Sequence, residues 1–132
     1  MAIVSLGMDL AQIDRIADVC ERRGARFLER VFTPGEREYC EARASRVSSY
    51  AGRFAVKEAV MKALGTGWAR GVRWRDIEVV RRRGQAPEVL LHGKTAAIAA
   101  ERGIDRIHIT ITHDAGVAAA VAIAESDAGR GR

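Results

Sequence analysis

The sequence of 132 residues has no long hydrophobic run, and this absence excludes one class of proteins at the outset. A membrane-spanning helix needs about 18 or more consecutive apolar residues, and no segment here approaches that length. The N-terminus enters the apolar residues 3–6 without a preceding basic region, so it does not resemble a secretory signal peptide. We therefore expect a cytoplasmic protein with no membrane association.

Cysteine is scarce as well, with only Cys20 and Cys40 in the chain. The two lie far apart, lack a Cys-x-x-Cys spacing and have no neighbouring histidine, which gives no support to a metal site built on cysteine. Two interpretations stay open: a disulfide between them, or two buried or half-buried free thiols in a reducing cytoplasm.

Aromatic residues account for only 5% of the chain, whereas the net charge is +5 and the pI is near 9.9. A basic protein favours anionic partners, which include nucleic acids, phosphorylated metabolites and acidic proteins. A non-catalytic nucleic-acid-binding module is one alternative, but it would interleave basic residues with exposed aromatics. Trp68 and Trp74 instead fall around one loop, so we expect no nucleic-acid partner.

The hydrophobic periodicity predicts an α+β domain with an antiparallel sheet packed against helices. The expected strands span residues 2–8, 76–81, 88–91, 106–112 and 117–123, and the expected helices span 13–22, 34–46, 47–64 and 94–102. Residues 27–31 form a short apolar turn. Thr33, Pro34 and Glu36 make a strong helix start with a capping box. We expect one domain over residues 1–125 and a flexible tail over residues 126–132.

The helix expected at residues 47–64 carries charges in unusual places. On a helical wheel, Glu58 lies in the middle of an apolar arc and Lys62 stands beside it one turn later. A carboxylate on a buried face is costly unless it is paired or bound to a cation. An ion pair between the two residues is one interpretation. The other is a ligand site, because Gly65-Thr66-Gly67 follows and lets a ligand approach the backbone closely.

Two further features bear on that choice. Arg46, Arg53 and Lys57 form a basic flank of the same helix, which is either a solvated face or a holder for a second phosphate. Asp9 ends the first expected strand, where an aspartate is either a turn residue or a ligand. Two carboxylates from different elements are the usual protein contribution to a Mg²⁺ site, which phosphate oxygens and waters complete.

Together these stretches resemble the bacterial holo-acyl-carrier-protein synthases, the small class of the 4′-phosphopantetheinyl transferase superfamily. The resemblance covers residues 3 to about 125 and is carried by Gly7-Met8-Asp9-Leu10, Arg53-Phe54-Ala55-Val56-Lys57-Glu58-Ala59, Lys62-Ala63-Leu64-Gly65-Thr66-Gly67 and Ile111-Thr112-His113-Asp114. The Lys57-Glu58-Ala59 element with Lys62 and the glycines is specific, whereas the Gly-x-Asp pattern alone would be weak.

The resemblance implies transfer of 4′-phosphopantetheine from coenzyme A to a serine of apo-acyl carrier protein, with release of adenosine 3′,5′-bisphosphate. Asp9 and Glu58 are then the Mg²⁺ ligands beside the coenzyme A pyrophosphate, and Lys62 neutralises charge as the ester bond breaks. The base that accepts the serine proton stays open between Glu58 acting through a metal-bound water, another carboxylate and water. The carrier belongs to fatty-acid or polyketide biosynthesis.

The resemblance also assigns residues along the rest of coenzyme A. Arg46, Arg53 and His113 are expected near the 3′-phosphate and adenosine, and Gly65 and the backbone at Gly67 border the pyrophosphate. Two residues depart from the family pattern. Thr112 replaces a frequent serine and keeps its hydroxyl, whereas Met61 replaces a polar residue of some members and loses any phosphate contact there.

A basic surface and an oligomer complete the expectations. Arg15, Arg22 and Arg23 on the first helix resemble the surface that meets the acidic helix of the carrier protein. The family fold is trimeric, and one small domain is too small to enclose coenzyme A alone. We therefore expect a homotrimer with sites at the subunit interfaces, in which Asp9 and Glu58 come from one chain and part of the coenzyme A pocket comes from the next.

Overall fold

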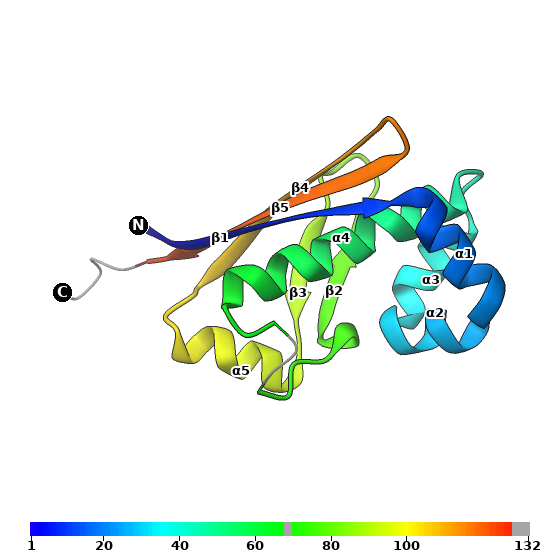
Figure 1. The fold of residues 1–132 in the computed structure, drawn as a ribbon. Coiled ribbons are helices and arrows are strands. Elements are labelled where there is room, and N and C mark those ends of the chain that lie inside the picture. Colours follow the sequence, from blue (N-terminus) through cyan, green and yellow to red (C-terminus); the bar gives the residue numbers. More distant parts are fainter. Residues whose placement is uncertain (68–69, 128–132) are drawn as a thin grey trace.

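The computed structural model describes residues 1–67 and 70–127, which form two antiparallel sheets and five α-helices (Figure 1). The strands are β1 (Ala2–Gln12), β2 (Ile77–Val80), β3 (Glu88–Leu91), β4 (Arg106–Asp114) and β5 (Val117–Ser126). The helices are α1 (Ile13–Arg23), α2 (Ala25–Val31), α3 (Pro34–Glu41), α4 (Arg46–Leu64) and α5 (Gly93–Glu101), with the 3₁₀ turn η1 (Trp74–Asp76) before β2. The predicted α+β class is confirmed.

The larger sheet has the strand order β1-β5-β4, and α4 packs across one of its faces (Figure 1). β5 is the central strand and alternates between its two faces. On the face toward α4 it carries the buried alanines Ala118, Ala120, Ala122 and Ala124, followed by Ser126 at the strand end. Because alanine side chains are short, the helix and the sheet lie close together. The hairpin of β2 and β3 covers α4 from another side, so α4 is the centre of the fold.

The tightest contact in this core is at Gly7, where β1 crosses α4. A Cβ atom at Gly7 would overlap the carbonyl oxygen of Ala59 and lie 2.8 Å from the backbone nitrogen of Ala63. Backbone atoms inside a helix cannot move aside without breaking the helix. The glycine is therefore required by close packing at the crossing point.

We expect Gly7→Ala to lower the free energy of unfolding by at least about 3 kcal/mol, since overpacking against backbone cannot be relieved by a rotamer change. Denaturant unfolding measures the effect. Gly35→Ala is the matched control, because the nearest atom to its new Cβ is a flexible carboxylate oxygen of Glu78 at 3.3 Å. A Gly7→Ala protein as stable as the Gly35→Ala protein would contradict this packing.

Several local expectations hold, and others need correction. Thr33 caps α3, and Glu36 completes the capping box as predicted. The first strand does not stop at residue 8, because pairing with β5 continues through Gln12. Residues 27–31 are not a simple turn but most of α2. This helix begins directly after Gly24, whose φ is +53°. A seven-residue helix spans only two turns, too few for its periodicity to be recognised in the sequence.

Lys57 overturns the expected basic flank of α4. Its ammonium group is fully buried and lies 2.8 Å from Glu36 Oε1. It also donates hydrogen bonds to the carbonyl oxygens of Trp74 and Ile77, so all three protons are used. Burial lowers the pKa of Lys57, and the Glu36 carboxylate opposes that shift. Lys57 is therefore a structural residue that joins α4 to α3 and β2 and cannot hold a phosphate.

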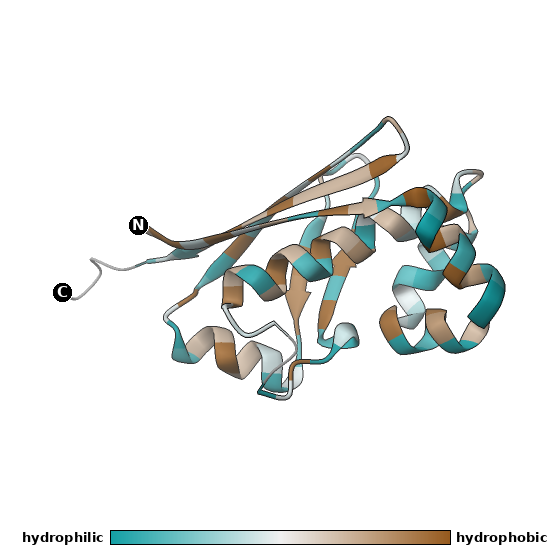
Figure 2. Cartoon of the chain, in the orientation of Figure 1, coloured by the Kyte–Doolittle hydropathy of each residue, from teal (hydrophilic) through white to brown (hydrophobic). Residues whose placement is uncertain are grey.

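The face of the larger sheet that points away from α4 is apolar and exposed. We call it the outer sheet face; it is formed by Leu6, Met8 and Leu10 of β1 and Val121 and Ile123 of β5. The three β1 side chains are between 57% and 63% exposed. Figure 2 shows hydrophobic residues along both strands. No helix covers this face in the described part of the chain.

The ends of the chain and the cysteines add three observations. The tail expected from residue 126 begins at the last residue of β5, and most of it, residues 128–132, lies outside the described residues. Among the described residues, none of the helices combines the length and apolar character that a membrane span requires. Cys20 and Cys40 are free thiols, which removes the disulfide interpretation. Burial raises the pKa of Cys40 to about 11.

Candidate active site

The candidate site begins at the one open stripe of α4. Most of this helix is buried, because the sheet covers one side and the β2–β3 hairpin covers the other. Phe54 and Glu58 are only half-buried and Lys62 is exposed, and these residues follow one another at a spacing of four. The expectation that Glu58 and Lys62 lie on a buried face is therefore corrected. They form the accessible stripe, while Arg53 and Lys57 are the buried charged residues of α4.

Asp9 meets this stripe from the edge strand β1. It is not a strand-ending residue as expected, since it pairs with Ala120 in the middle of the β1–β5 ladder. Lys62 Nζ lies 3.2 Å from Asp9 Oδ1 and donates a hydrogen bond of 2.9 Å to the carbonyl oxygen of Met8. Among the described residues Lys62 forms no ion pair with Glu58, so the simple helix salt bridge is excluded. The structure brings Asp9, Glu58 and Lys62 together.

The two carboxylates influence each other. Partial burial raises the pKa of Glu58, the Asp9 carboxylate raises it further, and Lys62 opposes both effects. No cluster of three or more His, Cys, Asp or Glu side chains with metal-binding geometry occurs within residues 1–67 and 70–127. Two oxygen ligands from the protein do fit a hard cation such as Mg²⁺ that takes its other ligands from phosphate and water. The donor set thus fits a metal that binds together with a phosphorylated substrate.

The raised pKa of Glu58 gives a prediction about stability. A carboxyl with a higher pKa in the folded state contributes stability below its unfolded pKa, near 4.5, and loses that contribution as the pH rises through the folded pKa. In metal-free buffer at pH 7 we therefore expect Glu58→Gln to be more stable than the wild type. The gain should be no more than about 1 kcal/mol, because water screens this half-exposed group.

Unfolding by denaturant at pH 7 and at about pH 4 measures this difference, which should shrink at the lower pH. Glu38→Gln is the control, because Glu38 is exposed on α3. A loss of stability in Glu58→Gln at pH 7, or a gain that does not depend on pH, would contradict the electrostatic description of the site.

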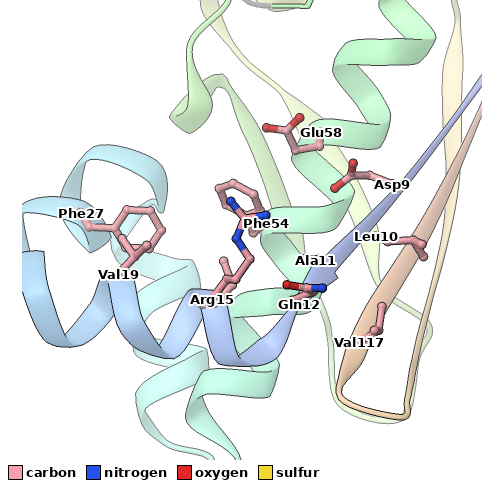
Figure 3. A pocket seen from close by; sticks show the side chains of 11 residues that line it. Asp9, Leu10, Ala11, Gln12, Arg15, Val19, Phe27, Phe54, Glu58 and Val117 are labelled. Carbon is pink, nitrogen blue, oxygen red and sulfur yellow. The ribbon is translucent and has the colours of Figure 1, made fainter.

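A pocket of about 510 Å³ opens beside Asp9 and Glu58. Figure 3 shows both carboxylates at its rim, with the Arg15 side chain extending from α1 toward Phe54. The remaining wall is mostly apolar and includes Val19 and Phe27. Arg15, expected only on a docking surface, therefore lines the same pocket as the carboxylates. Arg22 and Arg23 lie in the last turn of α1 and do not line this pocket.

A second pocket, of about 640 Å³, lies at the opposite edge of the sheet, beside β4. It contains two of the residues expected at the nucleotide end, Arg53 and His113. Arg53 is only 6% exposed, and no described residue accepts a hydrogen bond from its Nε atom. This unpaired donor is a cost within the fold, because the Nε atom is itself buried.

His113 is held in this second pocket by a backbone contact. Its Nε2 atom lies 3.0 Å from the carbonyl oxygen of Ser48, which can only accept, so the histidine nitrogen is the donor. Gly52 of α4 makes room for the ring, because a Cβ there would lie 3.1 Å from His113 Nε2. The first turn of α4 and the end of β4 thus position His113 together.

Three other expected residues have separate surroundings. Arg46 does not line either pocket, and its Nε atom lies 2.8 Å from Glu41 Oε1. The other carboxylate oxygen of Glu41, Oε2, accepts a hydrogen bond from the Tyr50 hydroxyl. Gly65 ends α4 in a left-handed conformation with φ of +75°. Gly67 also has a positive φ of +55°, and the space around its α-carbon is open. Both glycines are exposed, but the guanidinium group of Arg102 lies against the α-carbon of Gly65, so only Gly67 has open space around it.

Sequence reasoning missed the other cations of the second pocket. Arg43 and Arg81 line it, and Tyr39 lies among them. The run of arginines at residues 81–83 is visible in the sequence but follows a strand far from α4 along the chain. Nothing in the sequence indicates that this run lies near Arg43. Only the hairpin of β2 and β3, folded beside α4, brings these residues together.

Comparisons with known proteins show which family this chain resembles. The model of the 4′-phosphopantetheinyl transferase superfamily matches residues 5–122. The holo-[acyl-carrier-protein] synthase of Solibacter usitatus is 48% identical over 124 residues, which covers 94% of this chain and 99% of that protein. The fold is similar to the crystal structure of holo-[acyl-carrier-protein] synthase from Neisseria meningitidis, with a TM-score of 0.87, 29% identity and coverage of 95% of this chain and 100% of that chain.

A third similar protein was solved with a ligand. The Helicobacter pylori holo-[acyl-carrier-protein] synthase in complex with coenzyme A has a TM-score of 0.80 and 33% identity to this chain. The match covers 91% of this chain and 99% of that chain. The similarity thus extends over nearly the full length of each protein compared.

Proposed function

The chain belongs to the 4′-phosphopantetheinyl transferase superfamily, and on this premise we propose that it is a holo-[acyl-carrier-protein] synthase. It transfers the 4′-phosphopantetheine group from coenzyme A to a serine of apo-acyl carrier protein and releases adenosine 3′,5′-bisphosphate. The observation that carries this proposal is the meeting of Asp9, Glu58 and Lys62 at the rim of one pocket. Coenzyme A as a substrate is supported by the similar Helicobacter pylori enzyme, which was solved with it.

The reaction balances as a substitution at phosphorus. The serine oxygen of the carrier forms a bond to the β-phosphorus of the coenzyme A pyrophosphate, and the bond from that phosphorus to the bridging oxygen breaks. Adenosine 3′,5′-bisphosphate leaves with the electron pair, and the serine proton passes to a base. Little covalent chemistry is left to the protein, so positioning and charge stabilisation supply most of the rate.

The residues at the first pocket suit those two tasks. Lys62 is oriented by Asp9 and by the carbonyl oxygen of Met8, and its side chain is 54% exposed. Two of its three protons are thus used within the described protein, and one is left for a phosphate oxygen. Arg15 supplies a second cation in the same pocket. These groups are in place before charge develops on the leaving phosphate, which is the condition for effective electrostatic catalysis.

Asp9 and Glu58 are the proposed Mg²⁺ ligands. Their mutual repulsion, which contributes to the raised pKa of Glu58, would be relieved by a cation that both carboxylates hold. When bound, the ion stabilises negative charge on the phosphate oxygens and fixes their orientation. Asp9, Glu58 and Lys62 are accordingly the proposed catalytic residues.

The nucleotide end of coenzyme A is assigned to the second pocket. Arg53 and His113 line that pocket, and Arg53 carries the unused buried donor. Arg46 is the third residue proposed near the 3′-phosphate and adenosine, although its guanidinium already pairs with Glu41. Gly65 and the backbone at Gly67, after Lys62 on the chain, are proposed to border the pyrophosphate.

The positions of the two pockets support a homotrimer with shared sites. The first pocket lies at the β1 edge of the sheet and the second at the β4 edge. The two parts of the proposed coenzyme A site are therefore at opposite edges of one chain. The outer sheet face is exposed and apolar, which is typical of a surface that a second copy covers. We propose that the carboxylates of one subunit and the nucleotide pocket of the next form each complete site.

The acyl carrier protein is proposed to dock on α1. Arg15 lies in the pocket with the carboxylates, and Arg22 and Arg23 lie in the last turn of the same helix. Basic side chains along one helix attract an acidic partner and set its orientation more than its affinity. A carrier bound along α1 would therefore present its serine beside Asp9 and Glu58. We place the reaction in the cytoplasm, with which the free thiols are consistent.

Incubation with coenzyme A, Mg²⁺ and a cognate apo-carrier, followed by intact mass spectrometry, tests the proposed function. The carrier should gain the mass of one phosphopantetheine group, and adenosine 3′,5′-bisphosphate should appear in equal amount. An unmodified carrier would contradict the proposal. The rival nucleic-acid-binding module predicts steeply salt-dependent RNA binding without turnover. It is less well supported, because Trp74 stacks on Phe54 with ring centroids 5.0 Å apart. Trp68 lies outside the described residues.

A further inference from the structure

The carboxyl end of α4 is bonded to a cation from another helix. The last carbonyl groups of an α-helix have no partner within the helix and need one elsewhere. The carbonyl oxygen of Leu64, the last residue of α4, accepts a hydrogen bond from Nη1 of Arg102, which directly follows α5. The other carbonyl groups at this end are bonded to uncharged donors, the N–H group of Gly65 and the hydroxyl group of Ser5.

Arg102 also lies against the glycine turn, as we call the segment Gly65-Thr66-Gly67. A Cβ atom at Gly65 would lie 2.6 Å from Nη1 of Arg102 and 3.3 Å from its Nη2. The side chain of Arg102 is at the surface, because this residue and both glycines are exposed. A ligand that approaches the α-carbon of Gly65 therefore meets a guanidinium group.

The charge of Arg102 is not balanced by an acid. Among the described residues, no carboxylate lies at ion-pair distance from it. Its neighbour Glu101 pairs instead with Arg70, whose Nη2 lies 3.6 Å from Oε2 of Glu101. A guanidinium group has five N–H donors, and only one of them is hydrogen-bonded within the described protein. The others are left for a ligand.

The end of α4 needs such a cation if an anion is to bind there. The carboxyl end of a helix carries a partial negative charge, which repels an anion placed beside it. Lys62 lies in the last turn of α4, but its ammonium group is bonded to Asp9 and to the carbonyl oxygen of Met8. Arg102 is bonded directly to the end of the helix and therefore offsets its negative charge.

We propose that Arg102 is a further coenzyme A-binding residue, which supplies positive charge to the pyrophosphate at the glycine turn. This inference rests on the proposed function, which puts the pyrophosphate beside Gly65 and Gly67. The carbonyl group of Leu64 fixes the guanidinium group, and the free N–H donors bind phosphate oxygens in pairs. The sequence did not indicate Arg102, because its contact with Leu64 joins residues 38 positions apart.

Substitutions of Arg102 test this role. Arg102→Met should raise KM for coenzyme A about 5- to 30-fold, which corresponds to about 1–2 kcal/mol, the upper range for a charge at a helix end. The values of kcat and of KM for the carrier should not change, because the contact is made equally in the ground state and the transition state. Arg102→Lys keeps a positive charge with N–H donors and should recover most of the loss.

Arg37→Met is the matched control, because Arg37 also donates to a carbonyl group at a helix end. Its Nη1 lies 3.4 Å from the carbonyl oxygen of Phe32, the C-cap residue of α2. This variant should keep the wild-type KM for coenzyme A. An unchanged KM in Arg102→Met, a fall in kcat together with a higher KM for the carrier, or no recovery in Arg102→Lys would overturn the inference.

Calorimetry with coenzyme A and Mg²⁺, without carrier, separates this inference from the proposed function. Coenzyme A should bind Arg102→Met more weakly than the wild type, while circular dichroism shows that both proteins are folded. Weaker binding to the variant, with no transfer to a cognate carrier by the wild type, would overturn the proposed function alone. Transfer by the wild type, with equal affinity of both proteins for coenzyme A, would overturn the role of Arg102 alone.

Discussion

Glu58→Gln should lower kcat for phosphopantetheine transfer by about 10³-fold or more, while the protein stays folded. Glutamine keeps the size of the side chain but removes the negative charge that would hold the metal against the pyrophosphate. Because Glu58 is half-buried on the open stripe of α4 and is opposed by Asp9, losing its charge does not harm the metal-free fold. Turnover by intact mass, with the circular dichroism spectrum as a check on folding, measures the effect.

The same variant should also lose the stabilisation that Mg²⁺ and coenzyme A together give the wild type against heat, because ligand binding and stability are linked. Glu38→Gln, on the exposed part of α3, should behave like the wild type in both measurements. Retained Mg²⁺-dependent transfer in Glu58→Gln would place the metal elsewhere in the protein.

Lys57→Met should have the opposite effects to Glu58→Gln. It should greatly lower the free energy of unfolding and have little direct effect on the transfer reaction. The substitution leaves Glu36 as a buried carboxylate whose remaining partners are two backbone N–H groups, those of Thr33 and Val79. Removing one partner of a buried ion pair costs about 3–5 kcal/mol. The carbonyl oxygens of Trp74 and Ile77 also lose the donor that Lys57 provides. Denaturant unfolding monitored by circular dichroism measures the loss.

Lys94→Met is the control for this change, because Lys94 is an exposed lysine on α5. It should alter the free energy of unfolding by less than about 0.5 kcal/mol. If Lys57→Met were as stable as Lys94→Met but lost affinity for coenzyme A, Lys57 would be a phosphate ligand and its structural role would be wrong.

Much of the local structure could be predicted from the sequence, because local signals determine it. The capping box at Thr33 and Glu36 needs only residues three apart, and the structure confirms it. The strand expected over residues 106–112 lies within β4, and its register with β5 puts Ile107, Ile109 and Ile111 on the same face as the buried alanines. Both features depend on backbone geometry that repeats within one element.

Burial around α4 could not be predicted in the same way. The helix is apolar on two sides, so its sequence does not tell which strip faces the sheet and which faces the hairpin. Lys57 is buried because Glu36 comes from α3 to meet it, 21 residues away along the chain. Glu58 and Lys62 are accessible because β1 covers α4 only partly at its edge, where Asp9 lies.

In the candidate site, too, some residues could be identified from the sequence and others could not. Asp9, Glu58 and Lys62 were indicated by a family resemblance, and the structure brings them together. Arg43 and Tyr39 were not indicated, because their meeting with Arg53 depends on the packing of α3 against α4. Contacts of this kind between elements leave no periodic signal in the sequence.

Complementation between two inactive variants tests the shared site most directly. One parent carries Glu58→Gln, and the other carries Arg43→Met with Arg53→Met. If each site takes its carboxylates from one subunit and its arginines from the next, co-folding equal amounts should restore both halves in roughly a quarter of the sites of random trimers. We predict transfer activity near that fraction of the wild type. Activity no higher than that of the parents, in mixed trimers verified by native mass spectrometry, would contradict a site shared between subunits.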